Sequence, residues 1–147
     1  MSINIKGKIA IVTGASRGIG EGIAKVFSTE GATVICAARS TVDGDRVVKS
    51  INQNGGSAIF IQADIRLEAD CKRLINTVVE KYGRLDIMCH NAGIYPDELM
   101  EDMSIETWDD TINTNLRSCF LLTKPCVKVM RAQKSGRILF TSSGDSE

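Results

Sequence analysis

The segment IAIVTGASRGIG, residues 9–20, decides the fold. It begins with a short aliphatic run at 9–12 that is typical of a buried strand, continues through a turn containing three glycines, and enters a segment of helical period. A turn of this kind brings backbone N–H groups and the positive end of a helix dipole to one point. The segment therefore predicts an anion-binding turn at the edge of a parallel α/β sheet.

The three glycines have separate expected roles. Gly14 allows a tight turn, Gly18 allows a ligand to approach the backbone, and Gly20 allows the helix to pack closely against the strand. An ordinary glycine-rich turn is the alternative, because a glycine triplet alone is a weak signal. Features elsewhere in the chain must decide between the two.

Short aliphatic runs alternate with segments of helical period along the rest of the chain. Further strands are predicted at 33–37, 58–62, 87–90 and 137–141. Helices are predicted at 20–29, 46–54 and 67–82, and a longer helical region, which Pro125 should kink, at 104–127. This order predicts a Rossmann-like α/β fold, a doubly wound parallel sheet with helices on both faces.

Composition limits the domain count and the classes of partner. The 147 residues suffice for one domain, so 1–147 is expected to be a single dinucleotide-binding domain. Eighteen basic and eighteen acidic residues cancel and aromatic residues make up 5%, which does not favour nucleic-acid binding. Neither an apolar run long enough to cross a bilayer nor a signal peptide is present, so a cytoplasmic protein without a membrane partner is expected.

The five cysteines do not form a recognisable chemical motif. They are scattered, with no C-x-x-C pair and no nearby histidine to complete a metal site. We expect buried, reduced thiols and no metal.

Four motifs together resemble those of the short-chain dehydrogenase/reductase family. The glycine spacing at 14–20 is Gly-x-x-x-Gly-x-Gly, and HNAG at 90–93 is similar to the family's Asn-Asn-Ala-Gly, with His90 replacing the first Asn. TNL at 114–116 resembles its helical Asn motif, and the segment from Gly136 to Ser143 resembles its strand and catalytic serine. The resemblance covers nearly the whole chain and includes bacterial 3-oxoacyl-carrier-protein reductases.

The resemblance implies a nicotinamide dinucleotide and assigns residues to it. The expected cofactor-binding residues are Gly14, Ser16, Arg17, Gly18, Ile19, Gly20, Arg39, Ser40, Asp64, Ile65, Asn91, Ala92 and Gly93. The second strand ends without the carboxylate that binds the ribose hydroxyls of NAD, and Arg39 and Arg17 offer guanidinium groups suited to a 2′-phosphate. NADP is therefore favoured, with NAD as the alternative; otherwise the arginines are solvated surface charges and Asp64 is a cap or loop residue.

The resemblance also implies hydride transfer between the cofactor and a small-molecule carbonyl or secondary alcohol. Ser143 would bind the substrate oxygen, with Ser142 as the alternative, and Asn115 would organise water. Both could instead be plain structural polar residues. The family's Tyr-x-x-x-Lys is absent, because neither Tyr82 nor Tyr95 has a lysine four residues later.

These observations predict the amino-terminal part of an NADP-dependent oxidoreductase, incomplete after about the fifth strand and inactive as it stands. The full-length form is expected to be a homodimer or homotetramer. The alternative is a non-catalytic dinucleotide-binding or interaction module.

Overall fold

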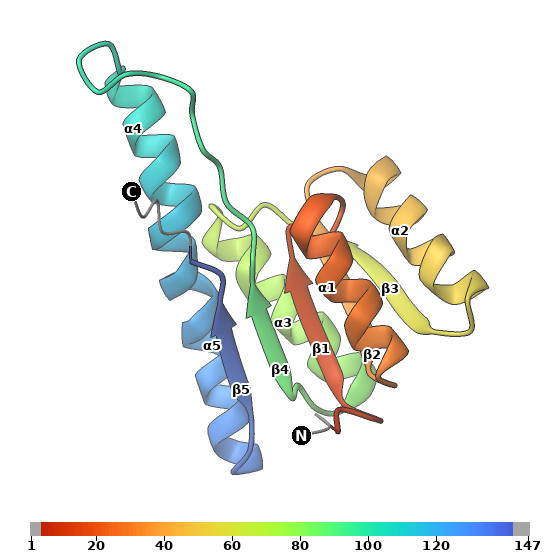
Figure 1. Cartoon of the computed structure of the whole chain (residues 1–147). Coiled ribbons are helices and arrows are strands. Elements are labelled where there is room, and N and C mark those ends of the chain that lie inside the picture. Colours follow the sequence, from red (N-terminus) through yellow and green to blue (C-terminus); the bar gives the residue numbers. More distant parts are fainter. Residues whose placement is uncertain (1–3, 143–147) are drawn as a thin grey trace.

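A five-stranded parallel sheet organises the chain. The computed structural model describes residues 4–142, and its strands lie in the order β3-β2-β1-β4-β5 (Figure 1). Their bounds are β1 Ile9–Thr13, β2 Thr33–Ala38, β3 Ser57–Gln62, β4 Ile87–His90 and β5 Arg137–Phe140. All five predicted strands and the parallel α/β fold are confirmed.

Helices cover both faces of the sheet, as predicted. Their bounds are α1 Gly18–Thr29, α2 Thr41–Gln53, α3 Glu68–Tyr82, α4 Ile105–Ile112 and α5 Ser118–Gln133, with a π-helical turn, η1 Asn113–Arg117, between the last two. One core lies between the sheet and α1 and α2, where Val12 and Val34 meet Ala24 and Val47. The strands alternate their side chains between the faces, so both faces need an apolar cover.

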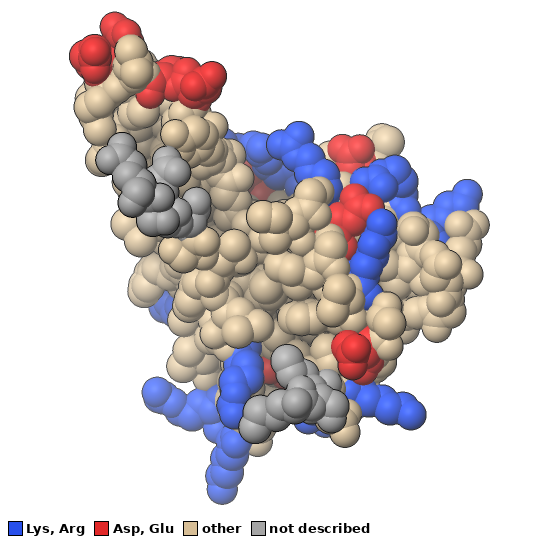
Figure 2. Space-filling model, in the orientation of Figure 1, with Lys and Arg blue, Asp and Glu red and all other residues tan. Residues whose placement is uncertain are grey.

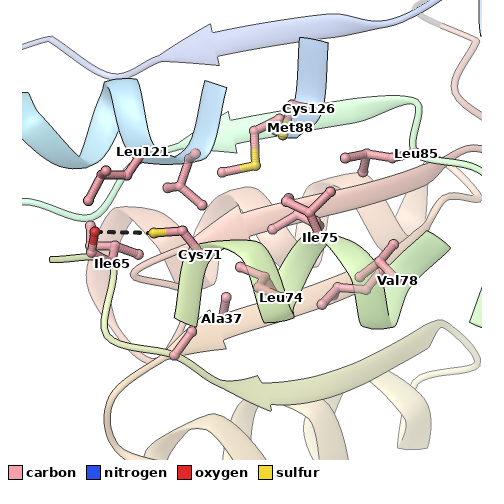
Figure 3. Close-up of a cluster of buried hydrophobic side chains, with 14 of the residues drawn as sticks. Ala37, Ile65, Cys71, Leu74, Ile75, Val78, Leu85, Met88, Leu121 and Cys126 are labelled. Atoms are coloured by element: carbon pink, nitrogen blue, oxygen red, sulfur yellow. Dashed lines mark hydrogen bonds between the residues drawn. The ribbon is translucent and has the colours of Figure 1, made fainter. Parts of the chain in front are cut away.

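The second core lies between the sheet and helices α3 and α5. Leu74, Ile75 and Val78 of α3 pack with Met88 of β4 and Leu121 of α5 (Figure 3). The apolar residues of α3 recur at helical spacing, which explains why the sequence pattern located this helix within one residue. Gly83 ends it in the left-handed conformation, with φ +72°.

The direction of the chain across the sheet reverses at β1. From β1 the chain runs outward to β2 and β3, and then returns to form β4 and β5 on the other side of β1. The loops that leave the carboxyl ends of β1 and β4 therefore diverge, and in open α/β sheets ligands bind in the crevice between such loops. The fold thus places residues 14–18 and 91–94 beside the same crevice.

Two helix boundaries differ from the sequence prediction. Helix α2 begins at Thr41, five residues before the predicted start, because Ser40 caps it by accepting a hydrogen bond from the Asp43 N–H. The helical region after residue 104 is divided at η1, and α5 continues through Pro125 to Gln133. The interruption therefore lies eight residues before the proline, in the turn that carries Asn115.

The cysteines, the helix lengths and the exposed apolar side chains of residues 4–142 bear on the predictions from composition. All five cysteines are free, and only Cys119 is not fully buried. Over these residues no helix is long and apolar enough to cross a membrane, and no three metal-ligating side chains cluster. Large apolar side chains are exposed along η1, α5 and β5: Leu116, Phe120, Val127, Leu139 and Phe140.

Candidate functional site

A cleft of about 800 Å³ runs along the carboxyl edge of the sheet. Its size lies within the range of small-molecule and cofactor sites. All the predicted cofactor residues except Gly20 line it, and it is also lined by Ala37, Ala38, Asp43, Ala63, Arg66, Ile94, Thr114 and Thr141. On one side, the lobe formed by α4 and the loop before it rises above the sheet, and acidic side chains gather at its tip (Figures 1 and 2).

The glycine-rich turn adopts the geometry that its spacing predicted. Gly14 has φ +65°, and a Cβ on it would lie 2.9 Å from the Ala92 Cα. A Cβ on Gly20 would lie 2.2 Å from the Gly14 carbonyl oxygen, so this residue packs directly behind the turn, outside the cleft. Gly18 has φ +55° and open space around it. The predicted tight turn and close packing are confirmed, and the approach of a phosphate to Gly18 stays a prediction.

The amino terminus of α1 opens into the cleft without a side-chain cap. Arg17 is its N-cap residue in extended conformation, and its side chain makes no capping hydrogen bond. Ser40 caps α2 and Ser104 caps α4, whereas α3, like α1, has no side-chain cap. The first N–H groups of a helix need partners, and an anion in the cleft would supply them.

An ion pair between α1 and α2 supports the turn from behind. The Arg46 guanidinium donates to Glu21 at 2.7 Å and to the Ser16 carbonyl at 3.0 Å. Hydrogen bonds from Arg46 and then Lys25 lower the Glu21 pKa to about 2. Sequence reasoning missed Arg46, because its partners lie 25 and 30 residues away and no local pattern marks them.

Thr13 joins the glycine turn to the end of β4. Its hydroxyl oxygen accepts hydrogen bonds from the Asn91 and Ala92 N–H groups, both at 3.1 Å. The Asn91 amide donates to the Thr13 carbonyl at 3.3 Å and accepts from the Thr141 hydroxyl at 3.3 Å. Asn91 therefore has a structural role between β4 and the glycine turn, whereas its contact with a cofactor stays a prediction.

His90, which stands where the Asn-Asn-Ala-Gly motif has its first Asn, lies beneath the cleft. It is 4% exposed, and its Nε2 is 2.9 Å from Ser118 Oγ. The Ser118 hydroxyl donates to the Thr114 carbonyl, so the serine oxygen is left to accept and Nε2 carries the proton. Burial lowers the His90 pKa below its usual value. The neutral imidazole therefore ties β4 to Ser118 at the start of α5 and, through the Ser118 hydroxyl, to Thr114 of η1.

Asn115 uses its whole amide on one backbone residue. Its Oδ1 accepts from the Ile94 N–H and its Nδ2 donates to the Ile94 carbonyl, both at 2.8 Å. Because the Ser118 N–H bonds back five residues to Asn113, the helix is locally widened at this point. Asn115 therefore fixes the loop after Gly93 at the margin of the cleft. This is the structural role that the sequence left open as an alternative to organising water.

The end of the cleft near β2 and β3 has mixed charge. Arg17 and Arg39 line it with exposed side chains. The sequence prediction noted no carboxylate at the end of β2, but the fold brings Asp43 and Asp64 to this part of the cleft. Asp43 lies in the first turn of α2, where its carboxylate accepts from the Ser40 hydroxyl at 2.7 Å. The strand itself ends without a carboxylate, as predicted, and the earlier start of α2 is what brings Asp43 near it.

Asp64 is paired with Arg66 two residues later. The guanidinium donates Nη2 to Asp64 at 2.6 Å and Nη1 to Asp110 of α4, also at 2.6 Å. Hydrogen bonds from Arg66 lower the Asp64 pKa, and the two carboxylates raise that of Arg66. Asp64 is therefore a charged loop residue. It does not occupy the N-cap position of α3, which is held by Leu67.

The predicted substrate-binding serine cannot be placed. Ser143 lies outside the described residues, whereas Ser142 is exposed and follows Thr141 at the margin of the cleft. Tyr95 is 88% exposed in the loop before α4. Among residues 4–142, the cleft therefore combines a glycine-rich turn and an uncapped helix terminus with backbone and amide groups, and its lining includes no tyrosine.

Fold and site together define a Rossmann-like domain with a nucleotide-sized cleft at its switch point. The family model for short chain dehydrogenases matches residues 8–147, and the chain belongs to this family. It is 42% identical to a 3-oxoacyl-[acyl-carrier-protein] reductase of Synechocystis over 92% of the chain and 56% of that protein. It is 37% identical to such a reductase of Vibrio harveyi over 96% and 57%, respectively.

A solved structure supports the same assignment. A proposed short-chain dehydrogenase/reductase from Burkholderia xenovorans superposes with a TM-score of 0.92 at 31% identity. The match covers 95% of this chain and 57% of the other. The chain thus spans about half the length of the curated relatives that it matches.

Membership of the family implies an NAD(P) cofactor, and the cleft fits one. The uncapped α1 terminus and the open space at Gly18 suit a pyrophosphate. On either side, the cleft extends to Arg39 and Asp64 in one direction and to Gly93 and Thr141 in the other. These two arms give room for the two nucleoside halves of a dinucleotide.

Proposed function

We propose that this chain is the dinucleotide-binding part of an NADP-dependent oxidoreductase that interconverts a carbonyl and a secondary alcohol. The observation that carries the proposal is the continuous cleft with the uncapped α1 terminus at its centre. The bound cofactor would supply the hydride acceptor or donor. The chain itself would bind the pyrophosphate at Gly18 and Ile19 and align the two halves along the sheet edge.

The preference for NADP rests on Arg17 and Arg39. Both line the β2 side of the cleft, where the adenosine ribose of a Rossmann ligand lies. The nearby carboxylates of Asp43 and Asp64 are already engaged by Ser40 and Arg66. A 2′-phosphate would therefore meet two guanidinium groups and no carboxylate without a partner among the described residues.

Titration of NADPH and NADH onto the chain tests this proposal. Arg39→Ala should weaken NADPH binding about tenfold or more, because it removes one charge-assisted hydrogen bond to the 2′-phosphate. It should change NADH binding less than about twofold. Arg131→Ala, which removes an equal charge from an exposed site on α5 outside the cleft, is the matched control. Absence of binding of either dinucleotide to the folded chain would refute the proposal.

Ser143 would hold the substrate oxygen, as the resemblance assigns it. The resemblance assigns Asn115 to organising water, whereas its amide is bonded to Ile94, so here it would act by holding the loop after Gly93 in place. Residues 1–147 contain no Tyr-x-x-x-Lys, so we expect dinucleotide binding without turnover from this chain alone. Consumption of NADPH with small ketones or 3-oxoacyl thioesters would show that another group donates the proton.

A further inference from the structure

The peptide between Ser16 and Arg17, in the glycine-rich turn, is oriented by a residue of α2. Arg46 Nη2 donates to the Ser16 carbonyl at 3.0 Å. The peptide bond is trans, so the Arg17 N–H points away from that carbonyl and from Arg46. Among residues 4–142 this N–H has no hydrogen-bond partner, and both Ser16 and Arg17 line the cleft. The contact with Arg46 therefore leaves a backbone donor of the turn available to a ligand.

Arg46 also neutralises a carboxylate in the first turn of α1. Glu21 lies there, and its side chain is 16% exposed. Arg46 donates Nη2 and Nη1 to its two oxygens at 2.7 and 3.2 Å, and Lys25 donates to it at 2.6 Å. A carboxylate near the amino terminus of a helix opposes a second anion at the same positive end of the dipole. The two cations therefore remove a negative charge that would weaken phosphate binding.

The helix that carries Arg46 is fixed on both sides of this residue. A Cβ on Gly44 would lie 2.1 Å from the Phe60 ring, so α2 packs directly on β3 there, and Val47 is fully buried. Arg46 itself does not line the cleft. Its guanidinium reaches the turn and α1 at once because it presents several donors in a rigid fork, which the single nitrogen of lysine does not.

We propose that Arg46 is a positioning residue for the phosphate groups of the dinucleotide: it holds the Ser16–Arg17 peptide and neutralises Glu21, so that the amino terminus of α1 is open to an anion. This inference rests on the proposed dinucleotide binding. Arg46 acts on the ligand through the turn and through Glu21, without touching it.

The test compares the dissociation constants of NADPH and of inorganic pyrophosphate, measured by calorimetry. Arg46→Ala should weaken both about fivefold or more, because a donor of the turn is misplaced and Glu21 keeps one cation fewer. Arg46→Lys keeps the charge without the fork, so the loss should be smaller, about two- to fivefold. Lys49→Ala removes an equal charge from an exposed site on α2 outside the cleft, and should change both constants less than about twofold.

The charge of Glu21 provides a second measurement. With Arg46 present, Glu21→Gln should change NADPH affinity less than about twofold, since the carboxylate is already neutralised. In the Arg46→Ala background the same substitution should improve the affinity about threefold or more. A tie that only stabilised the fold would lower the free energy of unfolding without this coupling, and equal effects of Glu21→Gln in the two backgrounds would refute the neutralising role.

Failure of the inference and failure of the proposed function give different results. Unchanged NADPH affinity in either folded Arg46 variant would overturn the inference and leave the proposed function standing. Binding of pyrophosphate that depends on Arg46, with no binding of NADPH or NADH, would refute the proposed function and support the positioning role. Absence of binding of all three ligands would refute both.

Discussion

His90 Nε2 lies 2.9 Å from Ser118 Oγ, and both side chains are buried. Burial holds the His90 pKa below the value near 6.5 that the unfolded chain would have. As pH falls below about 6.5, the imidazole is therefore protonated in the unfolded state but not in the folded state. The free energy of unfolding then decreases until the pH reaches the lower pKa of His90 in the folded state. Above pH 6.5 this contribution is fully present.

Substitution of His90 should remove that dependence. It is the only histidine in the sequence, so His90→Asn should flatten the change in unfolding free energy between about pH 7 and 5, measured by urea denaturation. Ser118→Ala keeps the imidazole and serves as the comparison, because it should lower stability while retaining the slope. An unchanged slope in His90→Asn would show that another group titrates there.

Gly20 and Gly22 of α1 should respond oppositely to substitution by alanine. A Cβ on Gly20 would lie 2.2 Å from the Gly14 carbonyl, so Gly20→Ala should destabilise the fold by about 1–3 kcal/mol. Gly22, two residues later, has no atom within 4 Å of its Cβ position, so Gly22→Ala should stabilise by up to about 1 kcal/mol. Equal effects of the two substitutions on urea unfolding would contradict the packing role of Gly20.

Asn115 should control the mobility of the loop after Gly93. Asn115→Ala removes both hydrogen bonds to Ile94, and the Ile94 amide should then exchange faster with solvent in an NMR experiment. Asn115→Asp should also accelerate exchange of the Ile94 amide, because it replaces the Nδ2 donor to the Ile94 carbonyl with an oxygen. Amides of β1 and β2 are the internal control, since global destabilisation would accelerate them too.

The thiols should react in two groups. Burial raises the pKa of Cys36 and Cys126 to about 12 and that of Cys71 to about 11, and Cys89 is buried as well. Cys119 is the one partly accessible thiol. A disulfide reagent should therefore modify one of the five thiols in the native protein, with the others limited by unfolding. Rapid reaction of several thiols would contradict this packing.

The sequence predicted the sheet well because its information is local. Each strand is a short aliphatic run, and α3 shows helical spacing that a single window detects. The start of α2 was wrong, since Gly44 and several polar residues hide the pattern there and only the Ser40 cap marks the boundary. The division at η1 was missed as well, because the apolar spacing of residues 104–127 shows no break there.

The cleft was predicted only in part for a similar reason. Glycine spacing located the turn, and the resemblance located Asn91 and Asn115. No pattern in the sequence could show that Arg46 holds the Ser16 carbonyl, or that Arg66 reaches Asp110 as well as its neighbour Asp64, because these contacts join residues 30 and 44 positions apart. Such side chains meet only after the sheet is assembled.

The bond between Thr13 and Asn91 has a consequence for synthesis of the chain. The glycine turn is translated before β4, because the two N–H groups that donate to the Thr13 hydroxyl lie 78 and 79 residues later in the chain. A nascent chain that has not yet reached Ala92 therefore carries the complete glycine motif without the contacts that join it to β4. The glycine turn therefore gains its contacts to the other side of the cleft only after β4 has been synthesised, so we expect the cleft to be complete only from that stage of translation onward.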